Sequence, residues 1–172
     1  MSDLKIAIIG NEALDILDDN SPQQLKDADF WQLTTDEDLT TPNYVRTILL
    51  DEEFTSLKTD IADNILWQAK KIIFVSIVSG DIPSYVIKTA MQMAQDANID
   101  YSVIHVKPFT FEGKKRFDIH KEILDLLQTQ TGYNKMTVIE SNKFVTNLPA
   151  GINEITEKRN EEIKNIITDM IK

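Results

Sequence analysis

Short apolar runs alternate with helix-like patterns along almost the whole chain. The longest, Ile72–Val78 (IIFVSIV), is rich in β-branched residues and apolar on both faces, which is typical of a central strand in a parallel sheet. We predict six strands, at 4–9, 30–34, 47–50, 72–78, 101–106 and 136–139.

Between the strands, apolar residues recur three and four positions apart, the spacing of one helix face. This spacing predicts helices at 11–19, at 55–69, from Pro83 onward, around 117–127 and from about 152 to the C-terminus. Strands that alternate with helices indicate βαβ units. We therefore predict a single α/β domain over 1–172, with a doubly wound, mostly parallel six-stranded Rossmann-like sheet in strand order 3-2-1-4-5-6.

In such a sheet, ligands bind beyond the C-terminal strand ends, near the reversal of strand order. The loops to inspect are Gly10–Ala13, Val78–Ser84 and Lys107–Arg116. The first two hold one glycine each, Gly10 and Gly80, and neither carries a complete phosphate-binding glycine motif. Both also hold a carboxylate, so their residues alone favour a structural turn over a phosphate cradle.

The amino-acid composition excludes several kinds of functional site. The 172 residues include no cysteine and two histidines, which excludes disulfides, thiolate metal sites, cysteine nucleophiles and a histidine-rich metal centre. We expect His105 to be a satisfied sheet residue and His120 to pack on a helical stripe. Trp31 and Trp67 suit core or interface anchors. The sequence has neither an 18-residue apolar run nor a signal-peptide pattern, so we expect a cytoplasmic protein.

The net charge of −10 is unevenly distributed. Residues 1–60 hold 14 Asp or Glu against 4 Lys or Arg, whereas residues 61–172 hold 14 of each kind. An acidic chain repels phosphates and anionic lipids, so we expect neither nucleic acid nor membrane as a partner. The acidic third is more typical of a solvated face than of a docking face for something basic.

The segment KPFTFEGKKR, residues 107–116, resembles the loop after the fifth strand of FtsZ, the bacterial cell-division GTPase related to tubulin. More weakly, LKIAIIGNEALDIL, ADFWQLTTDEDL, AKKIIFVSIVSGD and MTVIESNKF resemble the strands and loops that build the nucleotide site of that family. The resemblance implies the N-terminal domain of the FtsZ/tubulin fold, with the last helix as its central helix. We expect the five apolar residues between Ile163 and Ile171 to pack on this domain or to form an interface.

The resemblance also implies a nucleotide site for GTP or GDP. The positions that match the family's contacts are Gly10, Asn11, Gly80, Glu112, Arg116, Asn142 and Glu157. Several positions depart from the family pattern. Asp81, Pro83 and Tyr85 replace glycines of the signature loop, and Asn153 replaces a stacking Phe. The contacts to the ribose survive better than those to the phosphates, which indicates a degenerate or altered site.

Three functions remain open at this stage. One is a non-hydrolysing interaction module that caps or modulates a cytoskeletal or cell-division filament, built from an FtsZ/tubulin-like partner or from the chain itself. The second is a GTP-binding or other nucleotide-binding protein with little or no hydrolysis. The third is an unrelated Rossmann-like enzyme. The chain ends in the helix that resembles the family's central helix, before the activating loop and the second domain, so we expect no GTPase activity from it alone and no catalytic residues.

Overall fold

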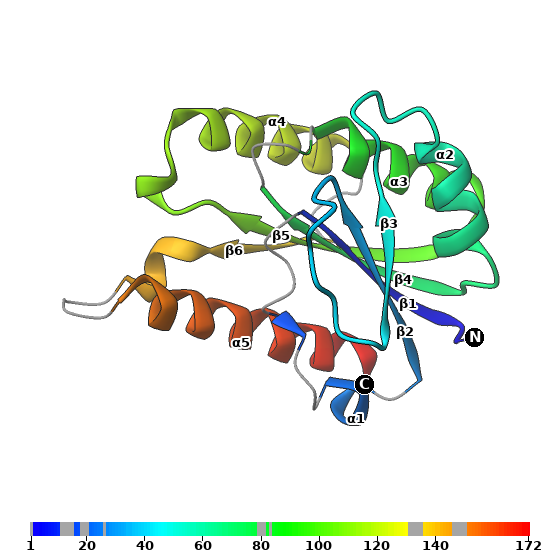
Figure 1. The fold of residues 1–172 in the computed structure, drawn as a ribbon, viewed down its shortest axis with the longest axis horizontal. Coiled ribbons are helices and arrows are strands. Elements are labelled where there is room, and N and C mark those ends of the chain that lie inside the picture. Colours follow the sequence, from blue (N-terminus) through cyan, green and yellow to red (C-terminus); the bar gives the residue numbers. More distant parts are fainter. Residues whose placement is uncertain are drawn as a thin grey trace.

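A computed structural model describes residues 2–10, 16–17, 21–25, 27–78, 82, 84–130, 136–145 and 151–172. Its centre is one six-stranded sheet in the order β3-β2-β1-β4-β5-β6, and every strand pair is parallel (Figure 1). The strands are β1 (Leu4–Ile9), β2 (Ala28–Thr34), β3 (Val45–Leu49), β4 (Lys71–Ile77), β5 (Asp100–Lys107) and β6 (Met136–Glu140). The predicted fold class and strand order are confirmed.

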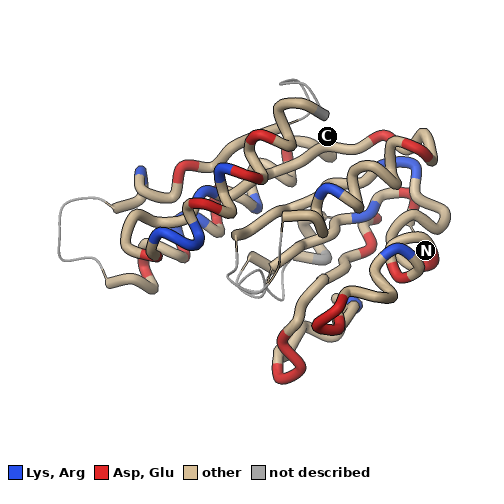
Figure 2. Tube along the Cα trace, turned by 90° about the horizontal axis from the view of Figure 1, so that it is seen from above, with Lys and Arg blue, Asp and Glu red and all other residues tan. Residues whose placement is uncertain are grey.

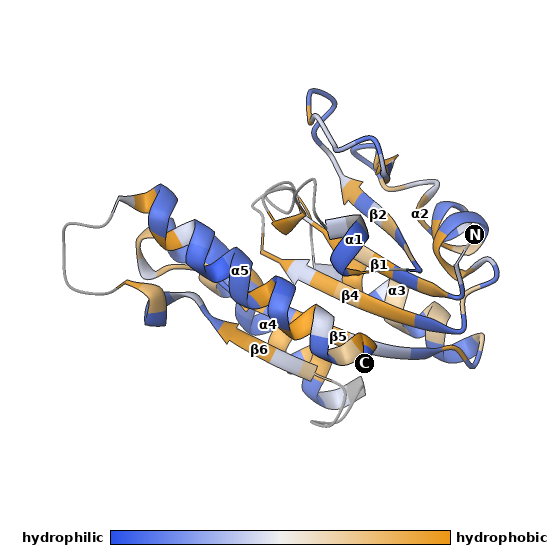
Figure 3. Cartoon of the chain, turned by 90° about the horizontal axis from the view of Figure 1, so that it is seen from below, coloured by the Kyte–Doolittle hydropathy of each residue, from blue (hydrophilic) through white to orange (hydrophobic). Residues whose placement is uncertain are grey.

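Two layers of helices cover the sheet (Figure 1). The upper layer holds α2 (Leu57–Asp60), its continuation η2 (Ile61–Leu66), α3 (Ser84–Asp96) and α4 (Lys114–Gln130); the lower layer holds α1 (Ser21–Gln24) and α5 (Ile152–Ile171). Alternate residues of β4 face opposite layers, so that Ile72 and Phe74 join the upper core while Ile73 and Val75 join the lower one. A strand buried on both faces is apolar at most of its positions, and Figure 3 shows β1 and β4 as mostly hydrophobic.

The last helix packs on this domain. Ile163 and Ile167 are fully buried in the lower core, and Ile166, Met170 and Ile171 pack against it. Of the two arrangements expected for this stripe, the structure shows packing on the domain.

Several boundaries differ from those predicted. The helix predicted at 55–69 begins at Leu57 and continues as the wider η2 turn, which ends at Leu66. Trp67 follows with a 57% exposed side chain, so it is not a core residue, whereas Trp31 is buried. The predicted helix at 11–19 lies mostly outside the described residues, as does Pro83 before α3. In the described part of the chain, no helix is long and apolar enough to span a membrane.

Candidate functional site

The loop after β5 folds around one carboxylate. Glu112 closes the short η3 turn (Thr110–Glu112), and its Oε2 accepts a hydrogen bond from the Phe109 backbone N–H at 2.9 Å. Its Oε1 accepts from the Arg116 guanidinium at 3.2 Å, one turn into α4. Gly113, with φ of +93°, makes the left-handed bend between the two helices. Glu112 and Arg116 therefore neutralise each other within the segment that carries the family resemblance.

Asn142 joins this loop from the neighbouring strand. It lies in the turn η5 (Ser141–Phe144) after β6, and its Oδ1 accepts from the Thr110 backbone N–H at 3.1 Å and hydroxyl at 3.2 Å. The Ser141 hydroxyl donates to the Lys107 carbonyl. The structure thus gathers three of the predicted site residues, Glu112, Arg116 and Asn142, beyond the ends of β5 and β6. A nucleotide-binding role for them stays a prediction.

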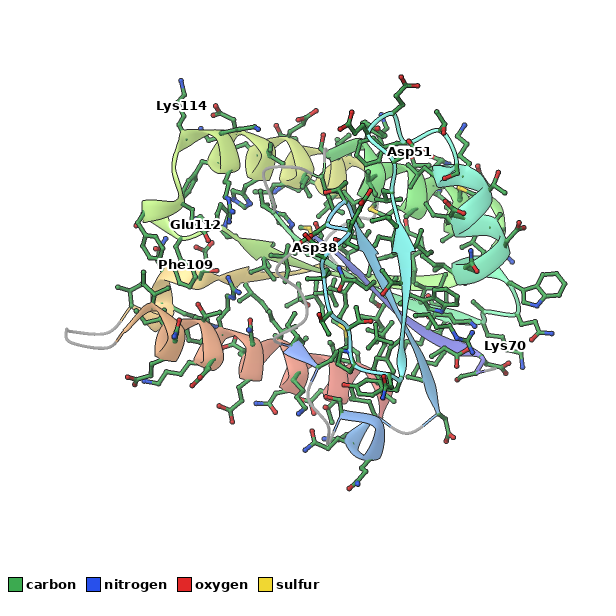
Figure 4. The ribbon with its side chains drawn as sticks, in the orientation of Figure 1. Asp38, Asp51, Lys70, Phe109, Glu112 and Lys114 are labelled. Carbon is green, nitrogen blue, oxygen red and sulfur yellow. The ribbon has the colours of Figure 1, made fainter. Side chains whose placement is uncertain are left out.

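The space between this loop and α5 is occupied by side chains that the sequence did not single out. Phe109 is 2% exposed, and the Arg159 guanidinium lies over its ring at 5.3 Å from the centroid. The neighbouring Asn160 is also buried, whereas the predicted Glu157 is exposed on α5. The spacing along α5 could have indicated the burial of Arg159. Buried residues of this helix recur every four positions, at 155, 159, 163 and 167, so Arg159 lies on the helix face that packs on the sheet. In Figure 4, Phe109 and Glu112 lie together at this end of the sheet.

Gly10 ends β1 next to β4, at the reversal of strand order. Its φ is +136°, and a Cβ built there would lie 2.7 Å from the Ile77 carbonyl oxygen. Its own carbonyl accepts a hydrogen bond from the Gln32 side-chain amide. The ends of β1 and β4 approach too closely here for a Cβ, so the packing of the sheet accounts for this glycine without a phosphate-binding role. The other predicted residues of the phosphate loops, Asn11 and Gly80, lie outside the described residues.

Gly10→Ala should therefore destabilise the fold by about 2 kcal/mol, because the added Cβ meets a backbone atom and the backbone angle is unfavourable for alanine. Urea unfolding followed by circular dichroism measures the loss. Gly151→Ala is the matched control, since a Cβ there meets nothing within 4 Å. Equal stability of the two variants would show that the contact with Ile77 does not constrain β1.

The acidic loops converge on a groove beyond β2 and β3. Its volume is about 760 Å³, and it is lined by Thr35, Glu37, Leu49, Leu50, Asp51, Glu52 and Phe54. Figure 2 shows Asp and Glu segments at two loop tips on the lower side of the molecule. Part of the predicted acidic third therefore forms one concave surface at the C-terminal edge of the sheet, on the β2–β3 side of the reversal of strand order between β1 and β4.

Two buried histidines, His105 of β5 and His120 of α4, pair between the sheet and the helix. His105 Nε2 and His120 Nδ1 are 2.8 Å apart, and His105 Nδ1 lies 3.4 Å from the Ser76 hydroxyl. Burial lowers the pKa of His105 to about 3, and the neighbouring His120 adds to the effect. Burial also lowers the pKa of His120. Because both rings are buried, they suit structural roles in the sheet–helix interface, as expected.

The described residues hold no cluster of three or more His, Cys, Asp and Glu that could bind a metal ion. No protein-family model and no curated protein match the sequence.

Solved structures do match. An empty FtsZ dimer from M. jannaschii aligns over 97% of this chain with a TM-score of 0.77 and 15% identity. TubZ of Clostridium botulinum phage c-st aligns over 98% with a TM-score of 0.66 and 16% identity. CetZ from Methanosaeta thermophila aligns over 98% with a TM-score of 0.69 and 15% identity. The chain spans 54%, 58% and 54% of their respective lengths. At these identities the likeness shows the fold, and it confirms the resemblance at that level.

Proposed function

We propose that this FtsZ-fold domain is a non-hydrolysing interaction module with an altered nucleotide site, and that it caps or otherwise modulates a filament-forming partner. The observation that carries the proposal is the groove beyond β2 and β3, where Glu37, Asp51 and Glu52 line the C-terminal edge of the sheet next to the reversal of strand order. A nucleoside triphosphate needs N–H donors and cations at such an edge, and carboxylates repel it.

The cations beyond β5 offset this repulsion only in part. Arg116 is paired with Glu112, and Lys107 with Glu140 at 2.9 Å. Lys114 and Lys115 remain exposed at the start of α4. A phosphate group that drew Arg116 away from Glu112 would leave a partly buried carboxylate without its partner.

The fold supports the choice of a filament partner. The resemblance noted in the sequence implies head-to-tail assembly, and one of the matching FtsZ structures is a dimer. A head-to-tail filament grows only if each subunit presents both complementary interface surfaces. A domain that binds the exposed surface of the terminal subunit, and does not itself present the surface that the next subunit binds, therefore stops further addition.

A second candidate is a nucleotide-binding protein that does not hydrolyse its ligand. The contact of Asn142 with Thr110, close to Glu112 and Arg116, favours it, since these residues match the family's ribose and base positions. Arg116→Ala should then weaken nucleotide binding, whereas the exposed Lys121→Ala on the same helix should not.

Co-sedimentation with an FtsZ-type protein of the same organism tests the interaction module. We expect substoichiometric amounts of the chain to shorten or reduce filaments, and Arg116→Ala to act like the unaltered chain. Unchanged filament mass and length at equimolar amounts would contradict the proposal.

A further inference from the structure

We propose that the groove beyond β2 and β3 is the docking site for a basic segment of a partner protein, one in which Lys or Arg flanks a large apolar side chain. The inference deepens the proposed function and rests on it for the identity of the partner. The groove itself is defined by Thr35, Glu37, Leu49, Leu50, Asp51, Glu52 and Phe54.

The wall of the groove is apolar. Leu49, the last residue of the edge strand β3, is 48% exposed, and Leu50 and Phe54 line the groove beside it. Tyr85, 42% exposed at the start of α3, packs its ring edge-on against Phe54 at 5.3 Å. The exposed Leu49 and the partly exposed Phe54, both in this groove, give a partner's apolar side chain surface to bury.

The aromatic part of this wall is held in place. Phe54 adopts φ of +54°, an uncommon conformation for a bulky side chain. The turn that holds it is fixed by Asp51, whose carboxylate accepts from the Thr55 N–H at 2.9 Å and the Thr55 hydroxyl at 2.6 Å, while its carbonyl accepts from the Phe54 N–H at 3.1 Å. A preformed anchor loses little conformational entropy on binding.

The rim of the groove is negatively charged. Hydrogen bonds from Thr55 lower the pKa of Asp51, so this carboxylate stays ionised. Glu37 and Glu52 are exposed, and neither forms an ion pair with a described residue. Figure 4 labels Asp38 and Asp51 on the two acidic loops. Free carboxylates beside an apolar wall select a cationic, partly apolar ligand.

Charge complementarity separates a basic partner from the other occupants. A second copy of the chain would add another net charge of −10, and nucleic acids, phosphates and anionic lipids are repelled as well. The groove therefore fits a segment of a different, basic protein better than it fits a self-contact.

Fluorescence anisotropy with a labelled synthetic peptide tests the site. The probe carries leucines among lysines; one control peptide replaces Leu with Ser, and another replaces Lys with Glu. We expect only the Lys–Leu peptide to bind, more weakly as salt rises. Leu49→Ser and the double variant Glu37→Lys/Glu52→Lys should each weaken binding by roughly tenfold or more.

Matched controls exclude a general effect of charge or hydrophobicity. Trp67→Ser removes another exposed apolar side chain, which lies before β4 at the N-terminal end of the strands, and Glu161→Lys reverses an exposed charge on α5. Neither should change affinity. Equal losses in groove and control variants, binding of the Ser peptide as tight as that of the Leu peptide, or dimerisation of the chain through this groove would overturn the inference.

The same variants separate this inference from the proposed function. If the unaltered chain and its groove variants reduce filament assembly equally, the docking site is wrong and the interaction module stands. If the peptide binds at the groove but the chain leaves filaments unchanged, the docking site stands and the proposed function fails.

Discussion

Lys5→Met is expected to lower the free energy of unfolding by about 3 kcal/mol, because it removes one partner of a buried ion pair. The Lys5 side chain is 1% exposed, and its Nζ lies 2.7 Å from Asp29 Oδ2 across the β1–β2 pair. Burial raises the pKa of Asp29, but hydrogen bonds from Lys5 and the Ser2 N–H outweigh burial and leave that pKa below its usual value. Without Lys5, the partly buried carboxylate loses its counter-charge.

Urea unfolding at neutral pH measures the effect. Lys70→Met is the matched control, since Lys70 pairs with Asp3 at the same end of the sheet but is well exposed, and we expect no measurable change from it. The double variant Lys5→Met/Asp29→Leu should recover much of the lost stability, because an apolar pair can replace a buried ion pair. Equal stability of Lys5→Met and Lys70→Met would contradict this account of the pair.

The histidine pair should make the fold sensitive to acid. With a folded-state pKa of about 3 for His105, the unfolded chain binds a proton below pH 6.5 while the folded chain does not. Stability is therefore fully present above pH 6.5 and is lost as the pH falls toward 3. The expected slope is up to about 1.4 kcal/mol per pH unit for His105, with a further contribution from His120, whose pKa is also lowered.

Urea unfolding curves between pH 7 and 4 measure how the free energy of unfolding depends on pH. The slope of the unaltered protein is compared with that of the double variant His105→Leu/His120→Leu. The groups that face the pair are Ser76, Lys107, Phe117, Lys121 and Glu140, and all of them are retained in the variant. The unaltered protein should lose stability more steeply than the variant, by about 1 to 3 kcal/mol per pH unit. Parallel curves would show that the pair does not titrate on unfolding.

The strands could be predicted from sequence because a parallel sheet covered on both faces leaves long apolar runs. Their order followed from the doubly wound arrangement that alternating strands and helices favour. Apolar residues spaced three and four positions apart predicted the face of α5 that packs on the sheet. The hydrophobic pattern did not show that Lys5, which lies inside an apolar run, is buried. Its charge can be buried because it pairs with Asp29 in the neighbouring strand, and the sequence does not show that pairing. It also did not show where the helix after β3 changes to the wider η2 turn, since both geometries accommodate the same apolar spacing.

Part of the candidate site could be predicted from the sequence. The resemblance of segment 107–116 to a loop of the FtsZ family marked Glu112 and Arg116, and the weaker resemblance of MTVIESNKF marked Asn142. The ring contact of Arg159 with Phe109 joins residues fifty positions apart and needs the packing of α5. The groove needs the loops after β2 and β3 to converge, and sequence showed only that both are acidic.

The central proposal, that the acidic edge does not support a phosphate site, is tested most directly by calorimetric titration of the purified chain with guanosine, GDP and GTP in the presence of Mg²⁺. We predict that affinity does not increase as phosphates are added and that GTP is not turned over. An affinity that rises with each phosphate, together with steady phosphate release, would contradict the account.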